Sequence, residues 1–307
     1  MKPIVVVGSI NMDMVSRTAR IPSPGETIFG TSFQTHTGGK GANQAVAVAK
    51  LGYPVIMLGK VGQDAFGREL VSALHTYGVD MSEVEAVAGS SGTASIVVDD
   101  RGENSIIVIP GANLLVDPQY VREKADVLRA AGMVLAQLEI PLETVACLAQ
   151  MCEEFGVPLV LDPAPAQRLD AATLARIAWF TPNQTEAQFY TQKAGSSDEV
   201  LARCFALGPK NIILKQGSDG ALIALAGGGR YAVNPFPVET VDTTAAGDAF
   251  NGAFAVALLS GLGPQASGQY AAAAAAISVT RTGAQSSLAN SNEVQELLNG
   301  RQQQANS

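Results

Sequence analysis

Residues 242–248 (DTTAAGD) have the residue types and spacing best suited to chemistry in this chain of 307 residues. They precede an apolar stretch, residues 250–259, that predicts a helix ended by Gly261. The first backbone N–H groups of a helix lack carbonyl partners, so residues 245–248 should offer an anion cradle beside the carboxylate of Asp248. This pairing suits phosphoryl transfer, because the amides neutralise charge on the transferred group and the carboxylate takes a proton from the attacking hydroxyl. The competing interpretation is that Asp248 only caps the helix.

A glycine-rich segment, residues 38–43 (GGKGAN), precedes a second expected helix that Gly52 should end. Its glycines allow backbone to approach a ligand closely, and Lys40 and Asn43 supply hydrogen-bond donors. It is not a Walker loop, because Gly41 rather than Ser or Thr follows the lysine. A plain glycine-rich helix entry is the alternative.

Two polar residues, Asn11 and Asp13, follow an apolar strand at residues 4–7. Ligands of open α/β sheets bind at the carboxyl ends of the strands. The i, i+2 spacing in extended chain points both side chains to one side, where an amide and a carboxylate suit the vicinal hydroxyls of a sugar. Turn-forming residues are the alternative.

Two further strand ends carry polar residues. Asn183 follows the strand at 178–180, and Glu186 three residues later completes a capping-box pattern. The functional interpretation assigns Asn183 to nucleotide phosphates and Glu186 to a magnesium shell through water. Residues 215–220 (KQGSDG) follow the strand at 212–214 and either wrap a nucleotide or form a tight turn.

The elements that must position these residues alternate between strands and helices. The pattern predicts an α/β fold, doubly wound, with a mostly parallel sheet flanked by helices. We expect one domain over residues 1–300 and a frayed tail at 301–307. The expected strands lie near 4–7, 55–58, 133–137 and 158–161, and the expected helices near 41–51, 64–77, 117–130, 142–155 and 270–280.

Two segments, about 14–37 and 92–111, interrupt the alternation with β-rich sequence, and residues 99–102 (DDRG) give a hairpin turn signal. We expect a small β-sheet lid that covers the site and excludes water. Ordinary edge strands are the alternative.

Composition excludes several classes of protein. A hydrophobic fraction of 47% with 16% charged residues predicts a large core, and a net charge of −8 without clustered Lys and Arg argues against nucleic-acid binding. No segment is long and apolar enough for a membrane span, and the run at residues 4–7 is too short for a signal peptide. Three cysteines without C-x-x-C spacing favour reduced thiols and a cytoplasmic protein, and two histidines leave little scope for a zinc site.

Taken together and in this order, the segments closely resemble the ribokinase family of carbohydrate kinases, also called PfkB-type, over nearly the whole chain. Residues 8–13 (GSINMD) match the sugar-binding start of the family, and residues 24–27 (PGET) with 38–43 match its first signature. Residues 59–67 (GKVGQDAFG) match the run that follows, and residues 242–248 match the second signature.

The resemblance implies ATP-dependent phosphorylation of D-ribose to D-ribose 5-phosphate, with Mg²⁺, an activating K⁺ ion and a homodimer formed through the lid. Sibling activities on 2-deoxyribose, another pentose, fructose or a nucleoside are the runner-up. The pair Asn11 and Asp13 favours a sugar with a free 2-hydroxyl, since leaving each buried polar group unpaired would cost about 1–3 kcal/mol. A non-catalytic sensor is a further alternative, whereas the lack of a dinucleotide fingerprint argues against a nicotinamide oxidoreductase.

The resemblance also implies roles for individual residues. Asp248 is the general base, and the N–H groups of Ala245, Ala246 and Gly247 form the anion hole. Lys215 replaces a small hydroxyl residue of some relatives, and Ala272 sits where a polar or ring side chain often meets adenine. The implied ribose contacts are Asn11, Asp13, Gly39, Lys40, Asn43, Glu139 and Asp248; the nucleotide and magnesium contacts are Asn183, Glu186, Lys215, Gly217, Ser218, Gly220, Gly247 and Ala272; the monovalent-cation positions are Asp242, Thr244, Ser278, Arg281, Gly283 and Ser287, several of them through backbone carbonyls.

Overall fold

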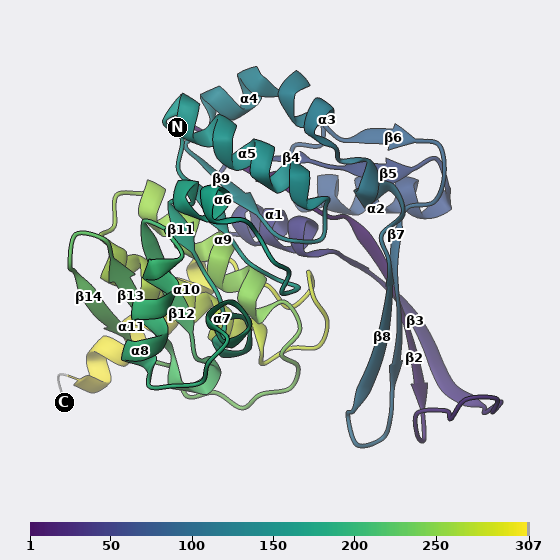
Figure 1. The fold of residues 1–307 in the computed structure, drawn as a ribbon. Coiled ribbons are helices and arrows are strands. Elements are labelled where there is room, and N and C mark those ends of the chain that lie inside the picture. The colour runs from purple at the N-terminus through teal and green to yellow at the C-terminus, as the bar shows by residue number, and fades with distance from the viewer. Residues whose placement is uncertain (306–307) are drawn as a thin grey trace.

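An eight-stranded sheet forms the centre of the molecule in a computed structural model, which describes residues 1–305 (Figure 1). Neighbouring strands run parallel except at one edge, where β13 pairs antiparallel with both β12 and β14. The prediction of a mostly parallel sheet is therefore confirmed. In spatial order the strands are β14 (Arg230–Val233), β13 (Ala221–Leu225), β12 (Asn211–Lys215), β11 (Trp179–Phe180), β10 (Leu159–Leu161), β9 (Met133–Ala136), β1 (Ile4–Val7) and β4 (Val55–Leu58).

Helices cover both faces of this sheet. In β1, Ile4 and Val6 pack into one apolar core and Val5 and Val7 into another, which explains why the strand is apolar throughout. The first face is covered by α1 (Lys40–Lys50), α2 (Ala65–Thr76), α9 (Ala246–Leu259), α10 (Pro264–Ser278) and α11 (Ser291–Ala305). The second face is covered by α3 (Pro118–Glu123), α4 (Ala125–Ala130), α5 (Leu142–Phe155), α6 (Ala171–Arg176), α7 (Gln184–Thr191) and α8 (Ser197–Ala206).

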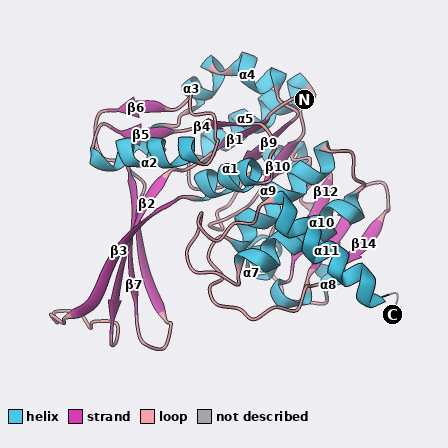
Figure 2. Cartoon of the chain, turned by 180° about the vertical axis from the view of Figure 1, so that it is seen from behind, coloured by secondary structure: helices cyan, strands magenta, loops and turns pink. Residues whose placement is uncertain are grey.

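A separate four-stranded sheet projects from this body, as Figures 1 and 2 show from opposite sides. Its order is β3 (Gly30–Gly38), β2 (Asn11–Thr18), β7 (Gly92–Val98) and β8 (Asn104–Ile109). The two segments that interrupted the α/β pattern thus pair with each other, and we refer to these four strands as the lid sheet. β2 begins at Asn11 and β3 ends at Gly38, so the residues expected to bind sugar lie at its base.

The motif at residues 59–67 anchors the root of the lid sheet. The carboxylate of Asp64 accepts hydrogen bonds from the backbone N–H of Gly67 (2.7 Å), from the hydroxyl of Ser91 (2.7 Å) and from the N–H of Ser91 (2.8 Å). The same hydroxyl of Ser91 accepts a bond from the N–H of Gly62 over 2.9 Å. The motif therefore ties the start of α2 to the strand that enters the lid sheet at β7.

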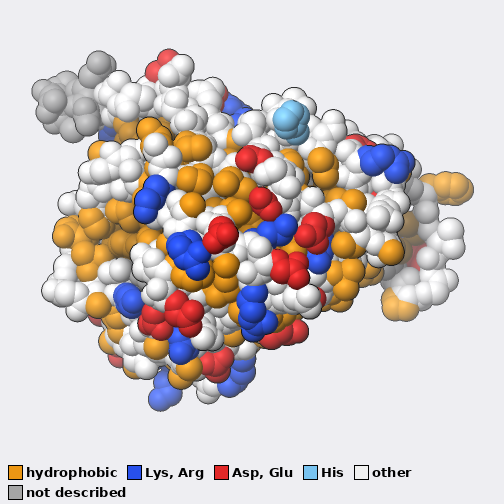
Figure 3. All heavy atoms as spheres, turned by 90° about the horizontal axis from the view of Figure 1, so that it is seen from above, with side chains coloured by type: hydrophobic (Ala, Val, Ile, Leu, Met, Phe, Trp, Pro, Cys, Tyr) orange, Lys and Arg blue, Asp and Glu red, His pale blue; other side chains and the backbone are white. Residues whose placement is uncertain are grey.

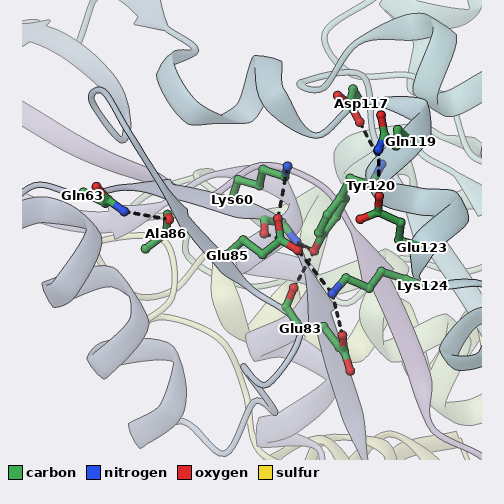
Figure 4. A network of polar contacts seen from close by, with 11 residues as sticks. Lys60, Gln63, Glu83, Glu85, Ala86, Asp117, Gln119, Tyr120, Glu123 and Lys124 are labelled. Atoms are coloured by element: carbon green, nitrogen blue, oxygen red, sulfur yellow. Dashed lines mark hydrogen bonds and ion pairs between the residues drawn. The ribbon is translucent and has the colours of Figure 1, made fainter.

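A polar network beside this root joins a short sheet of β5 (Lys60–Gly62) and β6 (Glu85–Val87) to α3 (Figure 4). The hydroxyl of Tyr120 accepts from the N–H of Gly59 over 3.0 Å and donates to the carbonyl of Glu83 over 2.6 Å. The ammonium groups of Lys60 and Lys124 lie 4.7 and 5.4 Å from the centre of the Tyr120 ring. This network closes one end of the body and fixes the segment from which β5 starts.

Three element boundaries differ from the sequence-based predictions. The alanine-rich helix α10 starts at Pro264 rather than 270, since proline is favoured in a first turn, and the helix expected over 117–130 breaks at Lys124 into α3 and α4. The frayed tail expected from residue 301 is not met as far as Ala305, because α11 continues to that residue. The guanidinium of Arg301 stacks 4.7 Å from the ring of Phe236 and holds this end against the body. Residues 306–307 of that prediction lie outside the described chain.

The surface seen from above mixes charges of both signs among apolar side chains, without a stripe of one sign (Figure 3). Within residues 1–305, none of the helices combines the length and the hydrophobicity that crossing a bilayer requires.

Candidate active site

Asp248 lies in the first turn of α9 with 4% of its surface exposed. The side-chain amide of Asn43 donates to its Oδ2 over 3.0 Å, and that of Gln44 donates to its Oδ1 over 3.1 Å. Both donors come from the first turn of α1, which crosses α9 so closely that a Cβ at Gly252 would lie 2.7 Å from the Cβ of Ala47. The helix crossing thus joins the two glycine-containing segments that the sequence singled out.

The environment of Asp248 raises the basicity of its carboxylate. Burial raises the pKa of its carboxyl to about 6, against the attraction of Lys40 and with the support of the negative charge of Asp162. A base is most useful when its pKa lies near the working pH, because it is then ionised and still binds a proton well.

The turn that precedes Asp248 presents backbone amides. Ala245 adopts a left-handed conformation with φ 61°, which is uncommon for a residue with a side chain. Within residues 1–305, the N–H groups of Ala245, Gly247 and Asp248 meet no acceptor, whereas that of Ala246 donates to the carbonyl of Thr243 over 3.3 Å. Three amides are therefore available to an anion here.

A lysine completes this cradle. A Cβ built on Gly247 would lie 3.4 Å from Nζ of Lys215, so the ammonium stands beside the first turn of α9. The same ammonium forms an ion pair with Oδ1 of Asp162 over 2.9 Å, and both side chains are largely buried.

The base of the lid sheet brings Asn11 and Asp13 to the same region. Asn11 is buried and accepts a bond from the side-chain amide of Asn113 over 2.7 Å. Burial, and then the charge of Glu139, raise the pKa of Asp13 to about 7. Gly39 has φ 88°, and a Cβ there would lie 2.8 Å from the N of Asn11, so only glycine fits this corner.

Glu139 and Lys40 extend the same polar wall. Oε2 of Glu139 accepts from the hydroxyl of Ser9 over 2.5 Å and from the backbone N–H of Lys40 over 3.1 Å. Burial opposes the charge on Lys40, but the surrounding carboxylates outweigh it and hold the pKa above its ordinary value. Oδ1 of Asn43 is buried without a hydrogen-bond partner among the described residues. Such an unsatisfied acceptor suits a hydroxyl donor from a bound ligand.

On the nucleotide side, Asn183 and Glu186 form the predicted capping box at the start of α7. Burial, and then the charge of Asp162, raise the pKa of Glu186 above its ordinary value. A buried carboxyl next to a second one fits a role near a divalent cation, whose charge would favour the ionised form. Residue 183 also bridges residue 215 between strand ends.

The turn after β12 contains the 3-10 helix Gly217–Asp219 and is open on its outer side, since a Cβ at Gly217 would meet nothing within 4 Å. Gly220 has φ 85° and its Cβ would lie 2.1 Å from the carbonyl oxygen of Val233, so the turn needs glycine there. Ala272 on α10 is 9% exposed within the main core, so it could offer a ligand only its methyl edge. Contacts of Gly217, Ser218, Gly220 and Ala272 with a nucleotide stay predictions.

The expected monovalent-cation positions come together in part. Oδ1 of Asp242 accepts from the N–H and the hydroxyl of Thr244, and Oδ2 accepts from the N–H of Gly283 over 2.9 Å. Burial opposes ionisation of Asp242, but these hydrogen bonds outweigh it and lower the pKa of the carboxyl. An ionised carboxylate beside a turn of carbonyl groups fits a hard cation. The side chains of Ser278, Arg281 and Ser287 instead bond to Ala275, Glu293 and Ala284, so these positions would act through backbone oxygens.

The sequence reasoning missed several side chains that touch the site. Asp162 follows β10 at its carboxyl end, which was a usable signal of the same kind as that of Asn11. Gln44 follows Asn43 in the first turn of α1, but nothing in the sequence indicated that both amides reach one carboxylate. The missed residues are Ser9, Gln44, Asn113, Gln137 and Asp162.

The chain is similar to known carbohydrate kinases in sequence and in fold. The sequence model of the pfkB family of carbohydrate kinases matches residues 1–291. The chain is 42% identical to a ribokinase of Bacillus subtilis over 97% of its own length and 100% of the relative's, and 38% identical to a deoxyribokinase of Salmonella typhi over 96% and 98%. The structure of Arabidopsis thaliana ribokinase complexed with ribose and ATP superposes with a TM-score of 0.92 at 36% identity, covering 97% of this chain and 98% of that one. With a family match over nearly all of the sequence and a shared fold, the chain belongs to the pfkB family of carbohydrate kinases.

Proposed function

We propose that this protein phosphorylates D-ribose on its 5-hydroxyl with ATP. The observation that carries the proposal is the buried carboxylate of Asp248, held by Asn43 at the edge of a turn with three free amides. Full-length similarity to ribokinases, one of them solved with ribose and ATP, supports the choice of substrates.

In the proposed reaction Asp248 accepts the proton of the sugar hydroxyl. The oxygen attacks the γ-phosphorus of ATP in line, a new oxygen–phosphorus bond forms, and the bond to ADP breaks with its electron pair on the leaving oxygen. The free amides at the start of α9 and the ammonium of Lys215 stabilise the negative charge of the transferred group. Asn11 and Asp13, at the base of the lid sheet, orient the sugar ring through its hydroxyls.

Mg²⁺ would neutralise phosphate charge in this reaction, and Glu186 with Asn183 would hold it through water. A K⁺ ion beside Asp242 would order the turn that presents the amides, since this carboxylate joins residues 242–244 to Gly283. Neither ion needs to touch the sugar.

The lid sheet supplies a surface for a second copy of the chain. It carries large apolar side chains that stand exposed, and its edge strand β8 is apolar and unpaired on one side. We therefore propose a homodimer formed through the lid sheets. The exposed residues are Phe33 (63%), Ile106 (52%), Ile107 (65%), Val108 (48%) and Ile109 (43%).

We also place the protein in the cytoplasm, where ATP is available and thiols stay reduced. Its cysteines Cys147, Cys152 and Cys204 form no disulfide.

A sibling activity on 2-deoxyribose is the second candidate, favoured by the 38% identity to a deoxyribokinase. The pair Asn11 and Asp13 at the base of the lid sheet argues for ribose, because a missing 2-hydroxyl would leave polar groups in this corner unpaired.

A substrate panel tests the proposal. ADP release should be measured with ribose, 2-deoxyribose, fructose and a nucleoside, in K⁺ and in Na⁺ buffers. We expect the highest kcat/KM for ribose and a higher rate in K⁺. A higher kcat/KM for 2-deoxyribose or fructose would contradict the assignment to ribose, and equal rates in both buffers would contradict the role of K⁺.

A further inference from the structure

Four side chains form a continuous line of contacts, which we call the relay: Lys215, Asp162, Gln44 and Asp248. Nζ of Lys215 lies 2.9 Å from Oδ1 of Asp162. The amide nitrogen of Gln44 donates to Oδ2 of Asp162 over 3.2 Å and to Oδ1 of Asp248 over 3.1 Å. The line uses both oxygens of Asp162 and Oδ1 of Asp248, and it ends at the proposed base.

A second glutamine fixes the orientation of the Gln44 side-chain amide. Its Oε1 accepts a hydrogen bond from the side-chain amide of Gln137 over 2.7 Å. A flipped amide would place that oxygen against two carboxylates, so only one orientation is stable. Gln44 is fully buried, so water does not compete for these bonds.

Lys215 connects the relay to the phosphate cradle. Its ammonium stands beside Gly247 in the first turn of α9, where the amides would hold the transferred phosphoryl group. A phosphate carries more negative charge than the single carboxylate of Asp162, so the ammonium has two competing partners when nucleotide is present.

The geometry points to the relay as a device by which the arrival of nucleotide phosphate strengthens Asp248 as a base. This inference rests on the proposed function, in which Asp248 takes the proton of the sugar hydroxyl. Without nucleotide, Lys215 offsets part of the charge of Asp162. With phosphate bound beside Gly247, the ammonium turns to the phosphate, and the charge of Asp162 then acts on Asp248 across one amide.

The remaining charges near Asp248 do not replace this effect. Lys40 on α1 is the cation that acts directly on Asp248, and it favours the ionised form, whereas Asp162 favours proton uptake. Glu139 and Glu186 act on Lys40, and Glu186 also feels Asp162 and Lys215. Of these groups, Lys215 is the one that stands beside the phosphate cradle and contacts Asp162 directly.

The test follows the titration of Asp248 itself by carbon-13 NMR of labelled aspartate carboxyls, assigned with Asp248→Asn. The proteins are the wild type, Lys215→Met, Asp162→Asn and the double variant. In the free proteins we expect the midpoint in Lys215→Met to lie on the order of 1 pH unit above the wild type, and that in Asp162→Asn to lie below it. On addition of the magnesium complex of the β,γ-imido analogue of ATP, the wild type should approach Lys215→Met.

The difference in midpoint between the wild type and Lys215→Met should close when nucleotide binds. This result is diagnostic, because the direct effect of the phosphate charge on Asp248 is present in both proteins. Equal midpoints without nucleotide, or a gap that nucleotide leaves unchanged, would overturn the relay. The double variant has no unpaired buried charge, so it replaces Lys215→Met if that variant does not fold. Nucleotide should raise the midpoint of Asp248 less in the double variant than in the wild type. An equal rise would also overturn the relay.

A matched control is Glu153→Gln, which removes one carboxylate of a surface ion pair with Arg176 (3.0 Å) and should titrate as the wild type does. The titration needs no turnover, so it is separate from the proposed function. Lack of ribose turnover in the wild type would contradict the proposed function, whereas turnover together with coincident titrations would overturn the relay alone.

Discussion

The side-chain amide of Asn43 donates to the carboxylate of Asp248 over 3.0 Å, across 205 residues of chain. Because Gln44 holds the other oxygen of the same carboxylate, the group is fixed in one orientation. This contact joins the start of α1 to the first turn of α9, so the residues proposed to bind the sugar and those proposed to bind the phosphate are built on one helix crossing.

Removing the base should stop turnover without removing the site. In Asp248→Asn the amide keeps the shape of the side chain but cannot take a proton. We expect kcat to fall roughly 10²–10⁴-fold while the dissociation constant for ribose changes little. Steady-state ADP release and titration calorimetry with ribose measure the two quantities.

The same chemical change at the surface is the control. The side chain of Asp126 is 99% exposed, so Asp126→Asn should behave as the wild type in both assays. If Asp248→Asn turned over at a near-normal rate, Asp248 would not be the base.

The crossing of α1 and α9 should tolerate no added side chain at Gly252. A Cβ there would lie 2.7 Å from the Cβ of Ala47 and 3.1 Å from the carbonyl oxygen of Gln44, so Gly252→Ala must push the two helices apart. We expect a loss of about 1–3 kcal/mol in the free energy of unfolding and a lower kcat, because Asn43 moves away from Asp248. Chemical denaturation and ADP release test both expectations.

A glycine-to-alanine substitution where the added methyl group meets no neighbour should raise the free energy of unfolding instead of lowering it. A Cβ at Gly300 on α11 would meet nothing within 4 Å, so Gly300→Ala should raise stability by roughly 0.5–1 kcal/mol and leave kcat unchanged. Stability gained in both variants would show that the crossing is loosely packed.

Much of this site could be predicted from the sequence, because its parts lie where local rules apply. The apolar run at residues 4–7 predicted a doubly covered strand, and Asn183 with Glu186 predicted a capping box; both are found. The glycines at 38–41 were expected to let a ligand approach the backbone. The short distances around Gly39 and Gly41 are to the backbone of residues 8–11, so the approach of a ligand stays a prediction.

What the sequence could not predict depends on packing between distant elements. Gln44 and Gln137 are unremarkable in sequence, yet they meet over 2.7 Å only because α1 crosses the end of β9. Likewise, Arg301 near the end of α11 contacts the ring of Phe236, although the two residues are 65 positions apart and share no local pattern.

A charged side chain on the lid sheet should disrupt the proposed dimer interface. Ile107 on β8 is 65% exposed, and burying a lysine at that position against a second copy would cost several kcal/mol. We expect Ile107→Lys to sediment as a monomer at concentrations where the wild type is a dimer. Leu262 lies between α9 and α10 and is 42% exposed, so Leu262→Lys is the control that should stay dimeric. Monomeric wild type at micromolar concentration would contradict the interface.

The buried carboxyl of Asp13 should destabilise the folded protein when it is ionised, so this cost should depend on pH. Its pKa is raised from the ordinary 3.8 to about 7 in the folded chain, first by burial and then by Glu139. A raised pKa in the folded state means that the stability contributed by the protonated carboxyl is fully present below about pH 4 and is lost as the pH rises through 7.

Asp13→Asn removes this loss, so the variant should be more stable than the wild type at pH 8 by roughly 1–3 kcal/mol, and this gain should shrink as the pH falls from 7 to 4. Its KM for ribose should rise, since the amide is a poorer acceptor for sugar hydroxyls. Thermal unfolding from pH 4 to 8 is the measurement, and Asp100→Asn on the exposed hairpin turn is the matched control. A difference in stability between Asp13→Asn and the wild type that is constant over this range would show that Asp13 titrates normally.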